Sequence, residues 1–124
     1  MFAPRWSPDG RYISTFSADQ RKLMLLEVAT GKWSERAAGR LLQFPNWTRD
    51  SKYVYFEDLG NEGPEIDRVP VTGAKKERVA ALKDIARVLM GADQPWNGVA
   101  LDNSPLIMRD VGSRELYSLE LQLP

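Results

Sequence analysis

Residues 6–12 have the sequence WSPDGRY, and residues 47–53 have the related sequence WTRDSKY. Three landmark positions recur at a spacing of 41 residues, namely Trp6 with Trp47, Asp9 with Asp50, and Tyr12 with Tyr53. A Thr-Gly pair follows each stretch, at residues 30–31 and again 42 residues later at 72–73. A period of this length indicates a repeat architecture.

A third and less regular copy lies 93 residues after the first. The segment ALDNSPLIM aligns with SPDGRYIST when Asp102 is placed on Asp9. The same shift places Leu116, Leu119 and Glu120 on Leu23, Leu26 and Glu27 without a gap. The sequence therefore predicts three repeat units, at about residues 2–40, 41–82 and 83–124.

Short segments rich in β-branched and aromatic residues alternate with turn signals inside each unit. RYISTFS, KLMLLEV, YVYFE and ELYSLEL are separated by Asp-Gly, Asp-Ser, Asp-Asn and Thr-Gly pairs, as antiparallel strands and their turns would be. Some strands are apolar on both faces, with Leu23 and Leu25 on one face and Met24 and Leu26 on the other. Such a sheet must be covered twice, as in four-stranded blades stacked around an axis. We expect an all-β fold of about three antiparallel β-propeller blades.

WSPDGRY resembles the WD-like repeat of TolB-type β-propellers, in which a Trp-Ser-Pro-Asp-Gly turn joins the first two strands of each blade. The second unit has Arg49 and Ser51 in place of the proline and glycine, and the third has Val99 at the tryptophan position. The resemblance implies part of a six-bladed ring. The repeat turn and blade core are then formed by Trp6, Asp9, Gly10, Tyr12, Trp47, Asp50, Tyr53 and Asp102.

Two segments need separate treatment. Residues 76–81 are expected to form the fourth strand of the second unit, and residues 83–90 a strand or connection, although ERVAALKDIARVLMGADQ also has helical apolar spacing. The ending SPLIMRDVGSRELYSLELQLP resembles the closing segment of bacterial propellers attached to a Ser/Thr kinase or a winged-helix regulator. Because the first repeat follows Met1 almost directly, the chain is expected to be part of a longer protein.

Composition excludes several function classes. The 124 residues contain no cysteine and no histidine, which removes thiol chemistry, the usual general base and the commonest metal ligand. Lysine and arginine number 17, as do aspartate and glutamate, so no net charge favours nucleic acid. Apolar runs such as LMLL are too short for membrane insertion. The compartment stays open between cytoplasm and periplasm.

Two groups of carboxylates invite a metal interpretation. The repeat aspartates could be ligands, but an aspartate at the start of a tight turn binds backbone amides two residues on, which explains its recurrence. The acidic segment FEDLGNEGPEID could hold calcium, but it has no calcium-loop spacing and is expected to be an exposed hairpin between two strands. A glycosidase pair is also conceivable, although the sequence does not fix any carboxylate separation. No catalytic, cofactor-binding or metal-binding residue is predicted.

The resulting hypothesis is a non-enzymatic interaction or sensing module. The alternatives are the gating propeller of a prolyl-oligopeptidase-like peptidase and a propeller that binds a small molecule or glycan. The third unit has no room for a fourth strand, because Gly31 shifted by 93 residues falls on Pro124. An unpaired edge favours pairing with another chain, so we expect a homodimer or higher assembly. The candidate partner edge is Glu115, Tyr117, Leu119 and Leu121.

Overall fold

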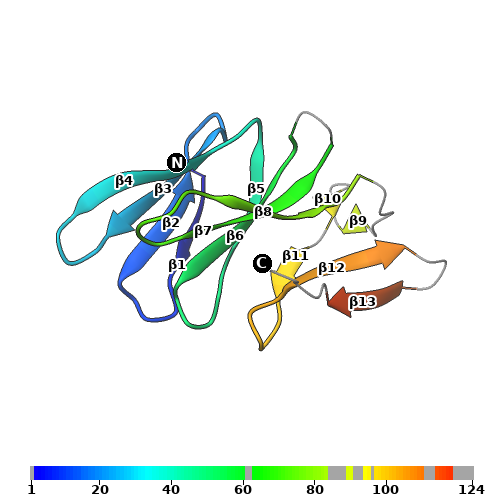
Figure 1. Ribbon diagram of the computed structural model, residues 1–124. Helices are drawn as coiled ribbons and strands as arrows, with labels where there is room; N and C mark the ends of the chain where they lie inside the picture. Colours follow the sequence, from blue (N-terminus) through cyan, green and yellow to red (C-terminus); the bar gives the residue numbers. More distant parts are fainter. Residues whose placement is uncertain are drawn as a thin grey trace.

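The computed structural model describes residues 2–60, 63–83, 89–90, 94–95, 97–110 and 114–118. Within these ranges the chain is all-β and its sheets are antiparallel, as the sequence predicts. Figure 1 shows the sheets following one another from the N-terminal end to the C-terminal end like adjacent blades. The order of strands in each blade-like sheet follows the order in the chain, which is the meander that the repeat pattern predicts.

The first two sheets have four strands each. The first sheet consists of β1 (Phe2–Trp6), β2 (Tyr12–Phe16), β3 (Lys22–Glu27) and β4 (Lys32–Ala38). The second sheet consists of β5 (Leu42–Trp47), β6 (Tyr53–Asp58), β7 (Glu65–Pro70) and β8 (Glu77–Ala81). The segment expected as a fourth strand at 76–81 therefore contributes β8.

The third sheet has three described strands, β11 (Asn97–Val99), β12 (Pro105–Asp110) and β13 (Arg114–Ser118). Any fourth strand of this sheet would involve residues 119–124, which lie outside the described residues. Between the second and third sheets, β9 (Leu89–Met90) pairs with β10 (Gln94–Pro95). The repeat alignment does not predict this pair. Residues 84–88, where helical spacing competed with strand, also lie outside the described residues.

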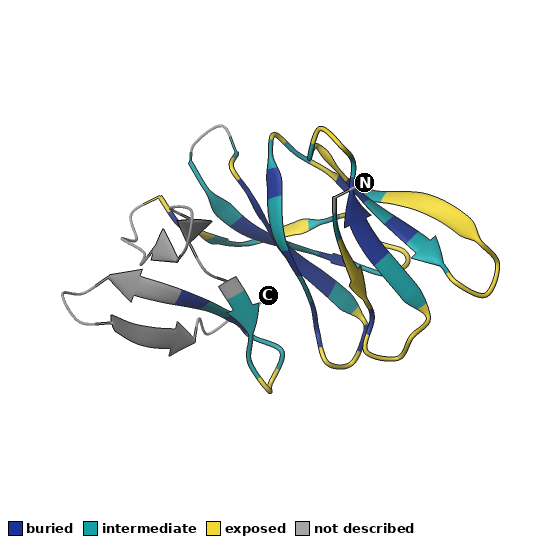
Figure 2. Cartoon of the chain, turned by 180° about the vertical axis from the view of Figure 1, so that it is seen from behind, coloured by how far each residue is buried: buried dark blue, intermediate teal, exposed yellow. Residues whose placement is uncertain are grey.

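The core lies between neighbouring sheets, because each sheet presents alternate side chains to the sheet on either side. The first core cluster joins the first and second sheets and contains Phe16, Leu23, Leu25, Ala37, Leu42, Trp47, Val54, Phe56 and Val69. The second cluster joins the second and third sheets and contains Tyr55, Ile66, Leu82 and Ile107. Figure 2 shows the buried residues concentrated in the centre of the molecule, whereas much of β4 is exposed.

The first strands of the first two sheets share an irregularity. Ala3 in β1 and Phe44 in β5 both have positive φ, 52° and 55°, and each precedes a proline. The register of β1 against β2 and of β5 against β6 shifts at these bulges. Because Ala3 and Phe44 are 41 residues apart, the bulge belongs to the repeat itself.

The acidic segment joins the second and third strands of its sheet, as expected, but three of its carboxylates are not exposed. Glu57, Asp58 and Asp67 lie within β6 and β7 and are buried, with exposed fractions of 3%, 5% and 1%. Strand alternation explains the burial of Asp67, which is two residues before Val69 and therefore points toward the first sheet as Val69 does. Glu62 lies outside the described residues.

Candidate functional site

The repeat aspartates organise the turns between the first and second strands. Asp9 Oδ1 accepts hydrogen bonds from Ser7 Oγ at 2.7 Å and from the Arg11 amide at 3.0 Å. Asp50 Oδ1 accepts the equivalent bonds from Thr48 Oγ1 at 2.6 Å and from the Lys52 amide at 3.0 Å. The hydroxyl bond is the main reason that the pKa of both carboxyls is lowered.

The third turn keeps the aspartate but is one residue shorter. Asp102 Oδ1 accepts hydrogen bonds from both the amide and the hydroxyl of Ser104, and these lower its pKa. Trp6 pairs with Ile13 across the first turn, whereas Val99 pairs with Pro105 across the third. The gapless shift of 93 residues therefore misplaces the strand after Asp102 by one position.

A side chain at one turn position connects neighbouring sheets. Gly10, Ser51 and Asn103 occupy this position and have φ values of 74°, 61° and 69°. The amide of Asp9 donates to Ser51 Oγ at 3.1 Å, and the amide of Arg49 donates to Asn103 Oδ1 at 2.6 Å. Serine and asparagine at this position therefore each accept a hydrogen bond from the preceding turn, which a glycine could not do.

Sequence reasoning missed a fourth copy of this turn, inside the first sheet. Ser17 Oγ donates to Asp19 Oδ1 at 2.6 Å, the Gln20 amide donates to the Ser17 carbonyl at 2.8 Å, and Gln20 has a φ of 58°. The turn joins β2 to β3. Its sequence SADQRK differs from SPDGRY only by substitutions, so a search for Ser-x-Asp at a shorter spacing would have found it.

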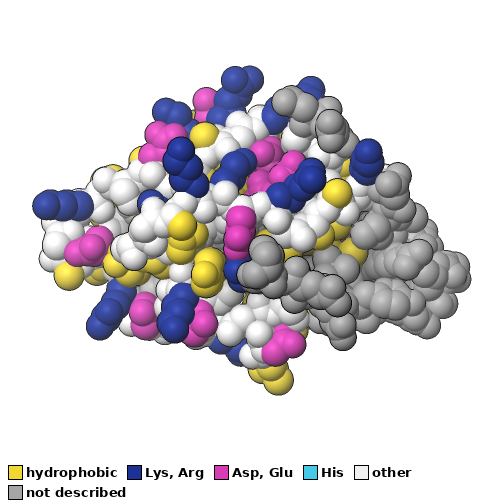
Figure 3. Space-filling model, in the orientation of Figure 1, with side chains coloured by type: hydrophobic (Ala, Val, Ile, Leu, Met, Phe, Trp, Pro, Cys, Tyr) yellow, Lys and Arg dark blue, Asp and Glu magenta, His cyan; other side chains and the backbone are white. Residues whose placement is uncertain are grey.

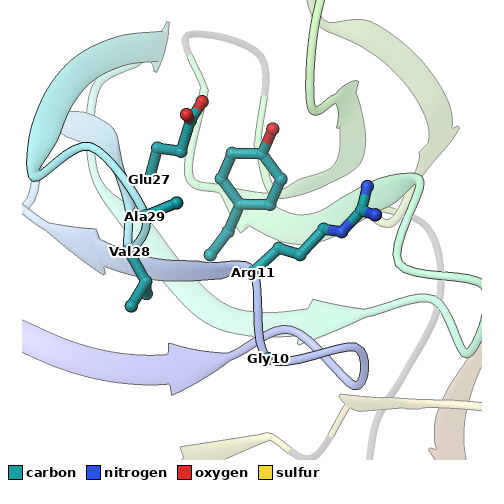
Figure 4. Close-up of a pocket in the computed structure, with 6 residues that line it drawn as sticks. Gly10, Arg11, Glu27, Val28 and Ala29 are labelled. Carbon is teal, nitrogen blue, oxygen red and sulfur yellow. The ribbon is translucent and has the colours of Figure 1, made fainter.

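Two pockets lie at the turn end of the sheets and are equivalent in the repeat. A pocket of about 460 Å³ between the first two sheets is lined by Asp9, Arg11, Tyr12, Asp50, Ser51, Lys52, Tyr53, Pro70, Val71 and Thr72. A pocket of about 490 Å³ on the first sheet is lined by Gly10, Arg11, Tyr12, Glu27, Val28 and Ala29 (Figure 4). The residues of the second pocket correspond to those that the second sheet contributes to the first pocket. Among the described residues, no sheet before the first one adds a further wall.

The buried carboxylates of the second sheet share a lysine. Lys76 Nζ lies 3.4 Å from Asp58 Oδ2 and 3.4 Å from Asp67 Oδ2. Asp58 Oδ1 also accepts hydrogen bonds from the amides of Arg40 and Leu41, which fixes the connection between the first two sheets. Asp67 Oδ1 is buried and has no hydrogen-bond partner among the described residues.

Burial raises the pKa of Asp67 to about 7, with a further contribution from Glu65. The described residues contain no group of three or more acidic side chains arranged to hold a metal ion. Lys76 supplies the positive charge of this cluster, which is therefore a structural ion network with one carboxyl that titrates close to neutrality.

The two repeat tryptophans have different surroundings. Trp47 is 9% exposed, stacks on Tyr12 with ring centroids 6.4 Å apart, and donates from Nε1 to Ser14 Oγ at 3.1 Å. Trp6 is 60% exposed and belongs to neither core cluster of the described residues. The physical reason is that Trp47 is covered by the sheet before it, and no described sheet precedes that of Trp6.

Trp6 is one end of an apolar row that crosses the whole first sheet. The register pairs Trp6 with Ile13, Ile13 with Leu26, and Leu26 with Trp33. Directly paired residues share a face of a sheet, so these four side chains form one stripe, which we call the tryptophan row. Trp33 is 45% exposed, and Ile13 and Leu26 are half-buried. The corresponding row of the second sheet, Trp47, Val54 and Val69, is buried against the first sheet.

The candidate partner edge is described only in part. Glu115 and Tyr117 lie in β13, which pairs with β12 on one side and is the last described strand of its sheet. Leu119 and Leu121 fall outside the described residues. Among the described residues, no helix has the length and apolarity that a membrane span requires. Positive and negative side chains are interspersed over the face in Figure 3.

No protein-family description and no curated protein matches the sequence. Solved structures do match: TolB from Acinetobacter baumannii has a TM-score of 0.69 at 20% identity, over 94% of this chain and 29% of that chain. A putative TolB from Agrobacterium tumefaciens gives 0.59 at 20% identity, over 85% of this chain and 36% of that chain. A structure from a study of two prolyl endopeptidases, of their inter-domain dynamics in catalysis and specificity, gives 0.62 at 17% identity, over 98% and 22%.

These likenesses show the fold. The chain has a TolB-like β-propeller fold, and it spans between 22% and 36% of the length of these three structures. The similarity to both kinds of protein fits the sheet order and the repeated turns described above, and identities of 20% or less concern architecture only.

Proposed function

We propose that this chain is a protein-binding module of the β-propeller type with no catalytic chemistry of its own. The observation that carries the proposal is the exposed tryptophan row of the first sheet. The same row in the second sheet is buried by a neighbouring sheet, with exposed fractions of 9%, 0% and 0% for Trp47, Val54 and Val69. The proposal takes the row as an interaction surface because the corresponding row of the second sheet is covered by a neighbouring sheet.

The side chains available for chemistry support a binding role. The chain has no histidine or cysteine. The carboxylates of Asp9 and Asp50 are occupied by hydrogen bonds inside their own turns, which lower their pKa and leave them poor proton donors at neutral pH. A sensing role, as in propellers attached to a kinase or winged-helix regulator, is the specific form of this proposal that the C-terminal sequence favours.

Two observations favour alternative functions. The similarity to a prolyl endopeptidase structure is compatible with an accessory gating propeller, whose catalytic groups would lie in another domain. The pocket of about 460 Å³ between the first two sheets has the size of a small-molecule site and combines two tyrosines with Arg11 and Lys52. Thermal-shift screening with sugars and small metabolites tests the second alternative, because a ligand of the folded state raises the melting temperature.

Photo-crosslinking tests the binding role directly. A benzoylphenylalanine in place of Trp6 keeps an aromatic side chain in the row, and irradiation in a lysate of the source cells should yield an adduct with a defined protein, identified by mass spectrometry. The matched control carries the same amino acid in place of Leu101, which is 80% exposed in the third turn and away from the row. If neither the lysate nor the purified chain yields a protein adduct specific to position 6, the proposed function is wrong.

A further inference from the structure

We propose that the pocket between the first two sheets, at the end where the repeated turns lie, is a binding site for an uncharged saccharide ring. Its volume of about 460 Å³ is within the range of small-molecule sites. All of its lining residues lie in the first two sheets or in their turns. None of them belongs to the tryptophan row, so the inference goes beyond the proposed function.

The three turns that line the pocket are connected to one another by hydrogen bonds. The amide of Asp9 in the first turn donates to Ser51 Oγ in the second, at 3.1 Å. The amide of Val71, in the turn between β7 and β8, donates to the carbonyl oxygen of Lys52 at 3.0 Å. The pocket is therefore preformed, and a ligand does not have to order these turns when it binds.

Two tyrosine rings supply the aromatic part of the pocket. Tyr12 is half-buried and stacks on Trp47, with ring centroids 6.4 Å apart. Tyr53 is also half-buried, and the guanidinium carbon of Arg68 lies over its ring, 4.2 Å from the centroid. Each ring is thus held in place by a second side chain. A pyranose ring presents an apolar C–H face, which packs favourably on such rings because an aromatic face carries partial negative charge.

Hydrogen-bond acceptors and donors alternate along the first two turns. In each turn a basic residue follows the aspartate by two positions, and all four residues are exposed, namely Asp9, Arg11, Asp50 and Lys52. The turn bonds go to Oδ1 of each aspartate, so Oδ2 takes no part in them. A saccharide hydroxyl both donates and accepts hydrogen bonds. Neighbouring hydroxyls therefore fit a carboxylate oxygen that lies beside a cationic N–H group.

The charges of the pocket favour an uncharged ligand. Its lining contains two basic and two acidic side chains, so an anion would meet both carboxylates and a cation both basic groups. Neither Arg11 nor Lys52 forms an ion pair with a described residue, which leaves their N–H groups available as donors. Figure 4 shows the guanidinium of Arg11 extending away from the carboxylate of Glu27.

Titration followed by nuclear magnetic resonance tests this inference. The isotope-labelled chain is titrated with glucose, galactose and N-acetylglucosamine, and with glucuronate as the charged comparison. We expect at least one of the neutral sugars to shift the amide signals of residues 9–12, 50–53 and 71–72. Arg11→Gln and Lys52→Gln should each weaken this binding by about tenfold, as the loss of one charge-assisted hydrogen bond implies.

The matched control is Arg21→Gln. Arg21 is exposed and holds the same place in the turn between β2 and β3, where its amide donates to Asp19 Oδ1 at 3.1 Å, but it does not line the pocket. This variant should bind the sugar as tightly as the native chain does. The dispersion of the amide spectrum shows which variants are folded, and if one of the two pocket variants is not, the other decides.

The titrations separate the outcomes. Shifts confined to the three turns, weakened by the pocket variants and unchanged by Arg21→Gln, support the saccharide site. Shifts with glucuronate alone would show an anion site and overturn the proposed class of ligand. Shifts elsewhere in the chain, or shifts that Lys52→Gln and Arg11→Gln leave unchanged, would place the sugar outside this pocket. The absence of shifts with all four sugars would overturn the inference, whereas the binding role of the tryptophan row is decided separately by crosslinking.

Discussion

The indole nitrogen of Trp47 donates a hydrogen bond to the hydroxyl of Ser14, 3.1 Å away, across the junction between the first and second sheets. The same nitrogen lies 3.3 Å from the carbonyl oxygen of Arg5, so one side chain of the second sheet is attached to two strands of the first. At the next junction Tyr55 and Val99 take the corresponding positions. At these positions the large residue lies in the later sheet at the first junction and in the earlier sheet at the second.

Truncation of Trp47 should be among the most damaging changes in the chain. Trp47→Ala removes a buried ring together with its stacking on Tyr12, and the free energy of unfolding should fall by about 3–5 kcal/mol. Urea denaturation measures this loss. Trp6→Ala provides the comparison, because Trp6 is 60% exposed and the change should have a small effect on the unfolding of the isolated chain. Equal losses at the two positions would contradict the assignment of Trp47 to a sheet junction.

The reversed order of large and small residues at the two junctions can be tested by introducing the residue types of the second junction at the first. Trp47→Val should be strongly destabilising, and Ser14→Tyr alone should cost about 1–3 kcal/mol through overpacking beside Trp47. The double variant carries the residue types of Tyr55 and Val99, which occupy the corresponding positions at the second junction, so it should be more stable than the sum of the single changes predicts, by at least about 1 kcal/mol. Additive losses in a double-mutant cycle would show that the two junctions are not equivalent.

The hydrogen bond between the first two turns predicts the order of stability of variants at Ser51. Ser51→Ala removes the acceptor of the Asp9 amide and keeps a β-carbon at a φ of 61°, so it should lower stability by about 1 kcal/mol. Ser51→Gly also loses the hydrogen bond but relieves the left-handed backbone, and it should be more stable than the alanine variant by up to about 1 kcal/mol. Denaturant titration of the three proteins gives the order, and an alanine variant as stable as the glycine variant would contradict the strain at this turn.

The turns offer a test of the metal interpretation of the repeat aspartates. Because Asp9 and Asp50 accept hydrogen bonds from their own turns, a chelator should leave the melting temperature of the chain unchanged. Asp50→Ala should lower that temperature to the same extent with and without chelator. A stabilisation by calcium that Asp50→Ala abolishes would restore the ligand role that the turn geometry argues against.

The sequence predicts the repeated turns and the sheet order well because both depend on local chemistry. An aspartate with a hydroxyl two residues earlier specifies the same turn wherever it occurs, and Ser17 with Asp19 makes it inside the first sheet as well. The exposure of Trp6 could not be predicted in this way. Burial of a blade residue depends on whether a neighbouring sheet covers it, and that is a property of the assembly.

The acidic segment shows a second limit of the sequence pattern. In EIDRVP, strand alternation places Asp67 and Val69 on one face. Because aspartate is rarely buried, the acidic residues favoured an exposed hairpin over a buried strand. In the structure Lys76, which lies just before the neighbouring strand β8, places its ammonium group 3.4 Å from Asp67 Oδ2. The alternation within β7 does not reveal this partner. The β9–β10 pair was missed because no other unit contains it.

Asp67 should make the stability of the chain depend on pH near neutrality. Burial raises its pKa in the folded chain to about 7, against an ordinary value of 3.8, so between these pH values the folded chain retains a proton that the unfolded chain releases. The stabilisation from this proton is complete below about pH 4 and is lost as the pH rises through about 7. Asp67→Asn removes the titration, so the free energy of unfolding of the native chain should fall relative to that of the variant between pH 5 and pH 8.

Glu35→Gln is the control, because Glu35 is in an exposed ion pair. The difference in free energy of unfolding between this variant and the native chain should stay constant over that range. Urea denaturation at several pH values measures both differences, and a constant difference for Asp67→Asn would mean that the buried carboxyl is already ionised at pH 5, held in that state by Lys76.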